Sequence, residues 1–416
     1  MTPTGRSVVQ PQRAIGELRE LQRLTADANG AQRVAFTEPW AAARAWFRDK
    51  LTDLPVESQQ DEAGNLWVTL RGRSERELLI GSHLDSVPDG GWLDGCLGVV
   101  AGLEVMRRIA GQGTPPVTVR LIDWADEEGA RFGRSLFGSS AAAGSMDPDV
   151  LRDLTDSGGV RLEDAVGPYG VDMARIAASE GQLRRAGAYL ELHIEQGPVL
   201  ESMDRPLGVV LGTFGIERHT IAFSGQTAHA GSTPMLRRRD AFAAAARLSL
   251  EIREIAIRRG GVSTVGSCST RPGIPTAVVG RCEITLDQRH LDAGRLADML
   301  QQAREASERI ACEEDVDVQW TPLWRIDPVT FHEELIDMAD EAVHEVAGSG
   351  RRLPSGPLHD AAEMARAGVP TAMLFVQSLR GLSHTREEDT RDEHLALAVA
   401  ALDRLADKTM SWLAGA

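Results

Sequence analysis

Short apolar runs alternate with amphipathic helices through the first half of the chain. The segments "NLWVTLRG", "ELLIGSH", "VTVRLIDW" and "AYLELHI" have the composition of buried strands. Between them, "LGVVAGLEVMRRIAGQG" has the length and apolar spacing of a helix that ends near Gly111. Two amphipathic helices precede these runs, and the second is expected over Glu38–Leu51 with Thr37 as its N-cap. Strands that alternate with helices predict an α/β layer.

This pattern is interrupted from about residue 213. The segments "ERHTIAFSG" and "AVVGRCEITLDQR" alternate like half-exposed strands, and long helices are expected over 240–259 and over "LADMLQQAREASERIA". With the closing strand "DVDVQW", the order is β-α-β-β-α-β, as in a ferredoxin-like α+β fold. The first pattern returns from about Ile326. Because 416 residues are many for one core, we predict an α/β domain, residues 1–212 and 327–416, interrupted by a smaller α+β domain, residues 213–326.

Charge, apolar runs and cysteine spacing exclude several classes of partner, location and site. The formal net charge of −16 argues against nucleic acid and anionic membranes as partners. The chain has no run of about 20 apolar residues and no apolar core of a signal peptide near its start, so the cytoplasm is the expected location. The four cysteines are far apart and form no CxxC pair. We expect buried thiols rather than disulfides or a cysteine zinc site.

Histidines and carboxylates follow the ends of the predicted strands. His83 and Asp85 come at the end of "ELLIGSH", His193 and Glu195 stand in "LELHIEQGP", and His384 lies beyond "AMLFV". A single histidine at a strand end is more often hydrogen-bonded than a metal ligand. In open α/β sheets, however, functional sites lie at the carboxyl ends of the strands, so these side chains converge if the strands are parallel neighbours.

A crowded acidic segment follows another strand. "DWADEEGARF" places Asp123, Asp126, Glu127 and Glu128 within six positions. Such carboxylates repel one another and resist desolvation, so the segment is either a solvated turn or a cation site. Asp94, in "GGWLDGCLG", is likewise either a turn residue or a ligand. Histidine and carboxylate without thiolate suit Zn²⁺, Mn²⁺, Co²⁺ or Ni²⁺ in a hydrolytic site.

Five blocks of sequence resemble one family. The blocks are "GSHLDSVPDGGWLDGCLGVVAGLE", "DEEGARFGRSLFGS", "ELHIEQGPVLE", "SGQTAHAGSTPM" and "GLSH", which together span residues 81 to 384. In this order they resemble the hydantoinase/carbamoylase branch of the M20 dinuclear metallohydrolases. That branch includes N-carbamoyl-L-amino acid hydrolases, allantoate amidohydrolases and β-ureidopropionases. The resemblance implies a mixed-sheet α/β dinuclear metallohydrolase domain with an inserted ferredoxin-like lid and dimerisation domain, and hence a homodimer.

The resemblance also implies a set of site residues. It assigns two divalent ions (Zn, Mn, Co or Ni) to each subunit, with Asp94 bridging them. His83 and His193 complete the first ligand set, and Glu128 and His384 complete the second. The resemblance makes Asp85 the residue that orients His83 and Glu127 the general base, and it makes His229 an oxyanion donor as well as a substrate contact.

On the substrate side, the sequence both matches the family pattern and departs from it. Gln196 and Arg289 match its substrate-binding glutamine and arginine, and an arginine fork suits a carboxylate. Thr276 stands where the family has asparagine. Pro357 and Leu358 in "SGPLHDAA" replace alanine and glycine. The remaining departures are Val279 and Gln377, each at a family proline.

These departures leave more than one function open. The interpretation we prefer is cleavage of a C–N bond in a ureido or related amide of an amino-acid-like substrate, with an altered substrate pocket. Unaltered carbamoyl-amino-acid specificity is the plainer alternative. N-acyl amino acid hydrolase or dipeptidase activity is another, although His193 favours the amidase branch, since M20 peptidases usually have a carboxylate there. A catalytically retired metal-binding or regulatory protein is a third, and the complete ligand set argues against it.

Overall fold

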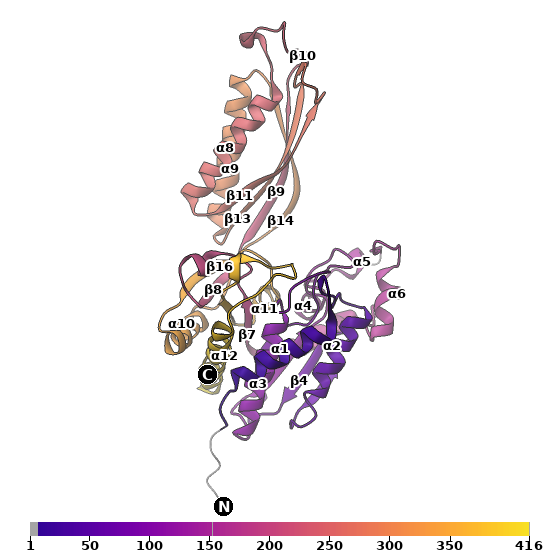
Figure 1. Ribbon diagram of the computed structural model, residues 1–416, viewed down its shortest axis with the longest axis vertical. Coiled ribbons are helices and arrows are strands. Elements are labelled where there is room, and N and C mark those ends of the chain that lie inside the picture. The colour runs from indigo at the N-terminus through magenta and orange to yellow at the C-terminus, as the bar shows by residue number, and fades with distance from the viewer. Residues whose placement is uncertain (1–6, 152, 416) are drawn as a thin grey trace, which may run out of the picture. The chain divides into compact units, whose positions relative to one another are not determined.

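A computed structural model describes residues 7–151 and 153–415 (Figure 1). The chain forms two compact units. Unit 1 comprises the described residues up to Leu211 together with those from Phe331 onward, and unit 2 is Gly212–Thr330. Each unit has a mixture of helices and strands, so the fold is mixed α/β. The roles of the units as a catalytic domain and a lid stay predictions.

The centre of unit 1 is a mixed sheet with strand order β8-β17-β7-β5-β6-β4-β3, with β16 beside β8. Its inner strands β6, β5, β7 and β17 are parallel, and antiparallel strands flank them on both sides. β5, β6 and β17 are buried along their whole length, as their continuous apolar runs predict. The bounds are β3 Glu57–Gln60, β4 Leu66–Leu70, β5 Glu77–His83, β6 Thr118–Trp124, β7 Ala186–Ile194, β8 Leu207–Thr213, β16 Arg351–Ser355 and β17 Thr371–Val376.

Helices cover this sheet (Figure 1). α3 is almost entirely buried and packs on β5, β6 and β7, while α1, α10 and α12 pack beside one another or on the strands. The longer helices are α1 Pro11–Thr25, α2 Glu38–Asp49, α3 Cys96–Gly111, α10 Glu333–Ala347 and α12 Asp392–Gly415. The shorter elements are β1 Ala26–Asp27, β2 Gly30–Ala31, α4 Phe137–Ala143, α5 Pro148–Leu151, α6 Leu162–Val166, η1 Gly167–Tyr169, η2 Ile176–Leu183, α7 Val199–Ser202, α11 Asp360–Arg366 and η4 Leu379–Gly381.

Unit 2 is a four-stranded antiparallel sheet with two long helices packed on it. Its sheet order is β11-β13-β9-β14, and the chain order β9-α8-β11-β13-α9-β14 is the predicted β-α-β-β-α-β order. Asp240 and Asp292 cap the two helices by accepting hydrogen bonds from backbone N–H groups. The bounds are β9 Gly215–Ser224, β10 Ala228–His229, η3 Met235–Arg237, α8 Ala241–Arg259, β11 Val262–Arg271, β12 Ala277–Val278, β13 Arg281–His290, α9 Ala293–Glu313, β14 Asp317–Ile326 and β15 Val329–Thr330.

One detail of the sequence interpretation was wrong, and another was confirmed only in position. Cys96 and Cys282 are buried, but Cys268 and Cys312 are exposed, so the thiols are not all core residues. Cys268 lies on β11, the terminal strand of its sheet, where side chains face solvent. Thr37 does hold the N-cap position of α2, but its side chain makes no capping bond, because its hydroxyl donates to the carbonyl of Val34 instead.

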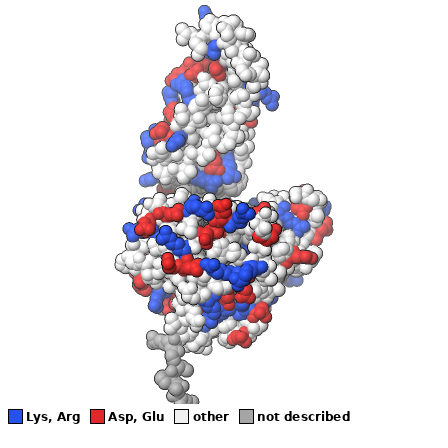
Figure 2. Space-filling view, viewed as in Figure 1, with Lys and Arg blue, Asp and Glu red and all other residues white. Residues whose placement is uncertain are grey.

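The surface agrees with the sequence composition. Figure 2 shows Lys and Arg interspersed with Asp and Glu over the visible face of unit 1, without a broad basic stripe on that face. Among the described helices, none is long and apolar enough to cross a membrane. Residues 1–6, on which part of the expectation about a signal peptide depended, lie outside the described residues.

Candidate metal centre

Neighbouring strands deliver the predicted site residues to one end of the unit 1 sheet. β5 ends at His83, β7 carries His193 as its penultimate residue, and β6 ends at Trp124, two residues before the acidic turn at residues 126–128. These strands are parallel neighbours in the order β6-β5-β7, so their carboxyl ends lie side by side. His384 lies eight residues beyond the end of β17 at Val376.

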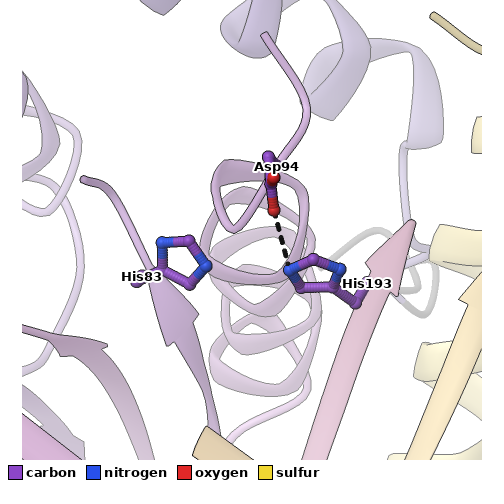
Figure 3. Close-up of side chains that lie close together, drawn as sticks. All are labelled: His83, Asp94 and His193. Carbon is purple, nitrogen blue, oxygen red and sulfur yellow. Dashed lines mark ion pairs between the residues drawn. The ribbon is translucent and has the colours of Figure 1, made fainter. Parts of the chain in front are cut away.

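The first group of ligand atoms comes from His83, Asp94 and His193. Their donor atoms all lie within 4.8 Å of one another, and all three residues are buried. His193 Nε2 is 3.1 Å from Asp94 Oδ1. Figure 3 shows the two imidazole rings on either side of a common space that the Asp94 carboxylate enters. Gly95 keeps this space open, because a Cβ there would lie 2.4 Å from the His83 ring.

A second group shares Asp94 with the first. Asp94, Glu128 and His384 also place one donor atom each within 4.8 Å of one another. His384 Nε2 is 3.3 Å from Asp94 Oδ2 and 3.4 Å from Glu128 Oε2. The two oxygens of Asp94 therefore face different histidines, one in each group. This is the arrangement that a carboxylate bridging two cations requires.

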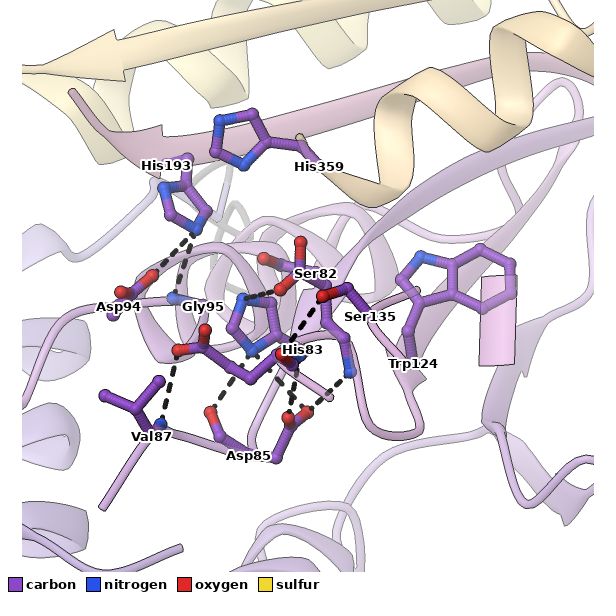
Figure 4. Close-up of polar contacts among 12 residues, drawn as sticks. Ser82, His83, Asp85, Val87, Asp94, Gly95, Trp124, Ser135, His193 and His359 are labelled. Carbon is purple, nitrogen blue, oxygen red and sulfur yellow. Dashed lines mark hydrogen bonds and ion pairs between the residues drawn. The ribbon is translucent and has the colours of Figure 1, made fainter. Parts of the chain in front are cut away.

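Backbone carbonyls orient the two buried imidazoles. His193 Nδ1 is 2.9 Å from the carbonyl oxygen of Ile194. His83 Nδ1 is 3.1 Å from the carbonyl oxygen of Asp85, which lies beside the ring in Figure 4. When both rings are neutral, Nδ1 donates in these bonds and the Nε2 lone pair is left for a ligand-binding role.

Asp85 acts mainly on the acidic turn. Its carboxylate oxygens accept hydrogen bonds of 3.2 Å from the backbone N–H groups of Glu127 and Glu128, while Oδ1 lies 3.6 Å from His83 Nδ1. The side chain predicted to orient His83 thus lies beside that ring and also fixes the backbone that carries both glutamates. Asp123, by contrast, is paired with Arg44 at 2.6 Å, which is a structural role.

Burial and crowding shift the pKa values of the cluster. Burial raises the pKa of Glu127 well above its usual value, and it raises the pKa of Glu128 to about 7. Burial also opposes ionisation of Asp94, but hydrogen bonds with His193 and His384 hold its pKa well below the usual value. The hydrogen bond with Asp94 raises the pKa of His384 to about 9.

The raised pKa values of Glu127 and Glu128 show that burial disfavours the charged forms of these two carboxylates. Asp126 Oδ1 is buried and has no hydrogen-bond partner among the described residues. Burying carboxylates without cations is costly, and divalent ions remove that cost. The donor set of imidazole and carboxylate oxygen therefore fits divalent metal ions.

Two residues that sequence reasoning missed hold the Asp94 loop. Glu388 Oε1 accepts backbone hydrogen bonds of 3.0 Å from Leu93 and Asp94. Ser383 Oγ lies 3.0 Å from Asp94 Oδ2 and 2.8 Å from Glu388 Oε2, and its single proton can be donated to either carboxylate. In the sequence, only their nearness to His384 in "LSHTREED" could have indicated this role, and an acidic run of this kind is typical of a solvated turn.

Of the predicted substrate residues, Gln196 lies at the metal groups. Its Nε2 donates to Asp94 Oδ2 at 2.9 Å. Gln196, Asp126 and His384 all have left-handed backbone conformations, with φ of 57°, 55° and 55°.

Two further positions at which the sequence departs from the family pattern lie in unit 1. Leu358 is half-buried in the loop before α11. Gln377 is buried and donates to the carbonyl of Arg205 at 3.2 Å.

The remaining predicted substrate residues lie in unit 2. His229 is on β10, directly opposite Ala277, so Thr276 is its close neighbour. His229 Nδ1 accepts hydrogen bonds from the backbone N–H groups of Gly231 and Ser232. The guanidinium of Arg289 donates to the Asp287 carboxylate at 2.8 Å and 3.3 Å.

Comparison with known proteins identifies the family. A family model described as Peptidase family M20/M25/M40 matches residues 79–408, a span that includes every histidine and carboxylate of both groups. The chain belongs to this family. The family resemblance of the five sequence blocks is thereby confirmed, and M20 metallohydrolases use divalent metals.

Members of the M20 family with amidohydrolase names are similar over nearly the whole chain. An allantoate amidohydrolase of Escherichia coli (strain K12) is 35% identical over 381 residues, which are 90% of this chain and 92% of that protein. An N-carbamoyl-L-amino acid amidohydrolase of Geobacillus stearothermophilus is 34% identical, over 95% of this chain and 97% of that one. A solved amidase of the hydantoinase/carbamoylase family from Burkholderia multivorans has a TM-score of 0.87 at 30% identity, covering 96% of this chain and 98% of that chain.

Proposed function

We propose that this protein is a metal-dependent amidohydrolase that cleaves a C–N bond of a ureido or related amide compound with an amino-acid-like anionic end. One observation carries the proposal. Asp94 is shared by two histidine-carboxylate groups, while the neighbouring Glu127 carboxylate belongs to neither group. The amidohydrolase names of the relatives agree with this chemistry.

The two groups would hold two divalent ions, of Zn, Mn, Co or Ni. His83, Asp94 and His193 would hold one, and Asp94, Glu128 and His384 the other. When bound, such ions polarise a carbonyl group and acidify a water molecule. The chain's own contribution is to fix this geometry: backbone carbonyls orient the imidazoles, and Glu388 with Ser383 holds the bridging Asp94.

Glu127 is the proposed general base. Its Oε2 lies 3.7 Å from His83 Nε2, which places the carboxylate beside the first group. Burial raises its pKa, which suits a group that takes a proton from water and then delivers it to the leaving nitrogen. Asp85 positions Glu127 through the backbone N–H of the acidic turn.

Unit 2 would supply polar groups for the substrate. The Nδ1 atom of His229 accepts two backbone hydrogen bonds, so the neutral ring carries its proton on Nε2. That N–H can donate to an oxyanion. Arg289, already oriented by Asp287, would bind a substrate carboxylate, and Thr276 would contact the substrate beside His229. In unit 1, Gln196 and Leu358 are the proposed substrate contacts.

Unit 2 also has features of a homodimer interface. β11 is the terminal strand of its sheet, and a strand edge of this kind is a template for pairing with a second chain. On α8, Leu250 and Ile257 are 69% and 63% exposed and lie two helical turns apart on one face. We propose that this strand and this helix face a second copy of the chain. Cytoplasmic location stays a prediction from the sequence.

The test is a substrate panel assayed with metal-loaded protein. N-carbamoyl-L-amino acids, allantoate and N-acyl amino acids would be compared by kcat/KM. Selective turnover of a ureido compound supports the proposed function, and preference for N-acyl amino acids would replace it with the aminoacylase alternative. High turnover on ordinary N-carbamoyl-L-amino acids would show that the substitutions at Thr276 and Leu358 do not alter specificity. A protein that binds metal but hydrolyses none of these compounds would support the retired alternative.

A further inference from the structure

A polar pocket lies in unit 1, away from the metal groups. It has a volume of about 280 Å³, and its charged lining consists of Glu77 and four arginines, Arg71, Arg120, Arg184 and Arg185. We call it the arginine pocket. The lining has four cations and one anion, and Glu57 and Glu75 pair with Arg71 and Arg185 at its rim, so the local charge stays positive in a chain whose formal net charge is −16. Such a local excess of positive charge favours an anionic ligand.

Arg120 forms the rigid floor of the arginine pocket. It is 5% exposed, and its guanidinium donates to Glu77 at 3.0 Å and to the backbone and side-chain oxygens of Gln182 at 3.0 Å and 2.6 Å. The same guanidinium stacks over Trp67 with its carbon 4.1 Å from the ring centroid. Its Nε is buried without a partner among the described residues. Because packing already fixes this cation, a ligand would not have to order it.

The other three arginines are weakly engaged. Arg71 pairs with Glu57 at 2.7 Å, but both side chains are mostly exposed. Arg185 lies 3.4 Å from Glu75, whose side chain is 81% exposed. Among the described residues Arg184 has no ion-pair partner. Exposed ion pairs contribute little free energy, so these side chains can turn toward a ligand at small cost.

An adjoining pocket gives room for the uncharged part of a ligand. It has a volume of about 500 Å³, shares Arg184 and Arg185 with the arginine pocket, and adds Pro370, Trp412 and Leu413. A charged group held by the arginines could therefore carry an organic group that lies against an apolar wall.

We propose that the arginine pocket binds a small molecule carrying a phosphate-type dianion. The guanidinium groups of Arg71, Arg184 and Arg185 would contact the oxyanion above Arg120, and the organic part would extend toward Trp412. Arginine suits this task because its planar fork of N–H donors matches phosphate oxygens in a bidentate manner. The proposal is independent of which amide the metal groups hydrolyse.

The arginine pocket and the metal groups lie at opposite ends of the same strands. β5 runs from Glu77 in the pocket to His83, which at the rise of a strand is roughly 20 Å. β6 runs from Arg120 toward the acidic turn, and β7 begins directly after Arg185 and carries His193. An occupant of the arginine pocket therefore cannot be a substrate in contact with the metal ligands.

Calorimetric titration of the metal-loaded full chain with inorganic phosphate tests this proposal. We expect Arg184→Gln/Arg185→Gln to weaken binding at this site by about tenfold or more, since charge-assisted hydrogen bonds are lost. The matched control is Arg23→Gln/Arg404→Gln, which removes the same charge from exposed positions of α1 and α12 in unit 1. The control should bind phosphate as the wild type does.

Phosphate bound at the metal ions must be separated from phosphate in the arginine pocket. In Mn²⁺-loaded protein, the paramagnetic ions broaden the ³¹P signal of a nearby phosphate far more strongly than that of a distant one. A moderately broadened bound signal that the arginine double variant removes supports the arginine pocket. Binding only at the metal ions, or equal losses in the double variant and its control, would overturn the proposal.

Discussion

At the scale of single residues, Glu127 and Glu128 are adjacent but face different histidines. Glu128 Oε2 lies 3.4 Å from His384 Nε2, within the second ligand group. Glu127 Oε2 lies 3.7 Å from His83 Nε2 and belongs to neither group. One carboxylate is thus placed to bind an ion and the other to move a proton.

Substituting each glutamate separately should divide these roles. We expect Glu127→Gln to retain two bound ions and to lower kcat by about a hundredfold to ten-thousandfold, as the loss of a general base does. Glu128→Gln should lose metal as well as activity. Elemental analysis of purified protein together with steady-state kinetics measures both effects. Full activity of Glu127→Gln at full metal content would show that another group takes the proton.

The pH dependence of metal binding follows from His384. Its hydrogen bond with Asp94 raises its pKa to about 9 in the metal-free protein, and it must lose its proton before its nitrogen can bind an ion. Mn²⁺ affinity should therefore rise with pH up to about 9, by about tenfold per pH unit for each proton displaced. Competition with a chelator at several pH values measures the affinity, and calorimetry in two buffers counts the protons. An affinity independent of pH between 7 and 9 would contradict this assignment.

Single residues differ in how well the sequence predicts their part in the site. Asp94 and the three histidines stand out because histidines at strand ends and an acid between glycines are recognisable without coordinates. Glu388 is not recognisable, because its role depends on reaching the backbone N–H groups of Leu93 and Asp94 from far along the chain. Only tertiary structure creates such a contact.

At the scale of elements, the close contact between α3 and the parallel strands sets the spacing of the ligand groups. Gly98 of α3 faces β5 and β7, and a Cβ there would lie 2.5 Å from the carbonyl oxygen of Leu192 and 2.6 Å from Ser82 Cβ. These two contacts precede His193 and His83 by one residue each. The distance between α3 and these strands therefore helps to set the positions of both imidazole rings.

Gly98→Ala should separate the helix from the strands. We expect a loss of about 1–3 kcal/mol in the free energy of unfolding, with weaker metal binding, since overpacking forces the backbone to move. Gly16→Ala is the control, because a Cβ at Gly16 in α1 meets nothing within 4 Å. That control should gain about 0.5–1 kcal/mol through helix propensity. Denaturant unfolding reports both values, and equal stability of the two variants would disprove the close packing.

Element types were easier to predict than their ends and neighbours. The apolar runs at β5, β6 and β17 and the helical periods of α8 and α9 predict these elements, because each pattern repeats over enough residues. The predicted helix over Glu38–Leu51 ends earlier, at Asp49. The family resemblance implied a mixed sheet, but local periodicity did not predict which strands are antiparallel, because pairing direction depends on the connections between strands.

At the scale of the whole molecule, the proposed homodimer makes a distinct prediction. We expect Leu250→Arg/Ile257→Arg to shift wild-type dimers to monomers, because two charges would have to be desolvated at the interface. Light scattering after size-exclusion chromatography measures the mass of both proteins. Leu24→Arg, at an exposed apolar position of unit 1, is the matched control and should leave the mass unchanged. A wild-type protein that is monomeric at all concentrations would exclude this interface.

Three residues at the metal site have backbone conformations that are sterically unfavourable for residues other than glycine. Asp126, Gln196 and His384 each have a φ near 55°, a conformation in which glycine avoids a steric penalty of about 1 kcal/mol or more. Heat resistance and catalysis therefore impose opposite preferences at these positions. A directed-evolution experiment that rewards thermal tolerance alone should accumulate glycine there, and one that rewards turnover should retain the present residues. The list of positions at which the two experiments diverge would outline the active site without any prior assignment of the substrate.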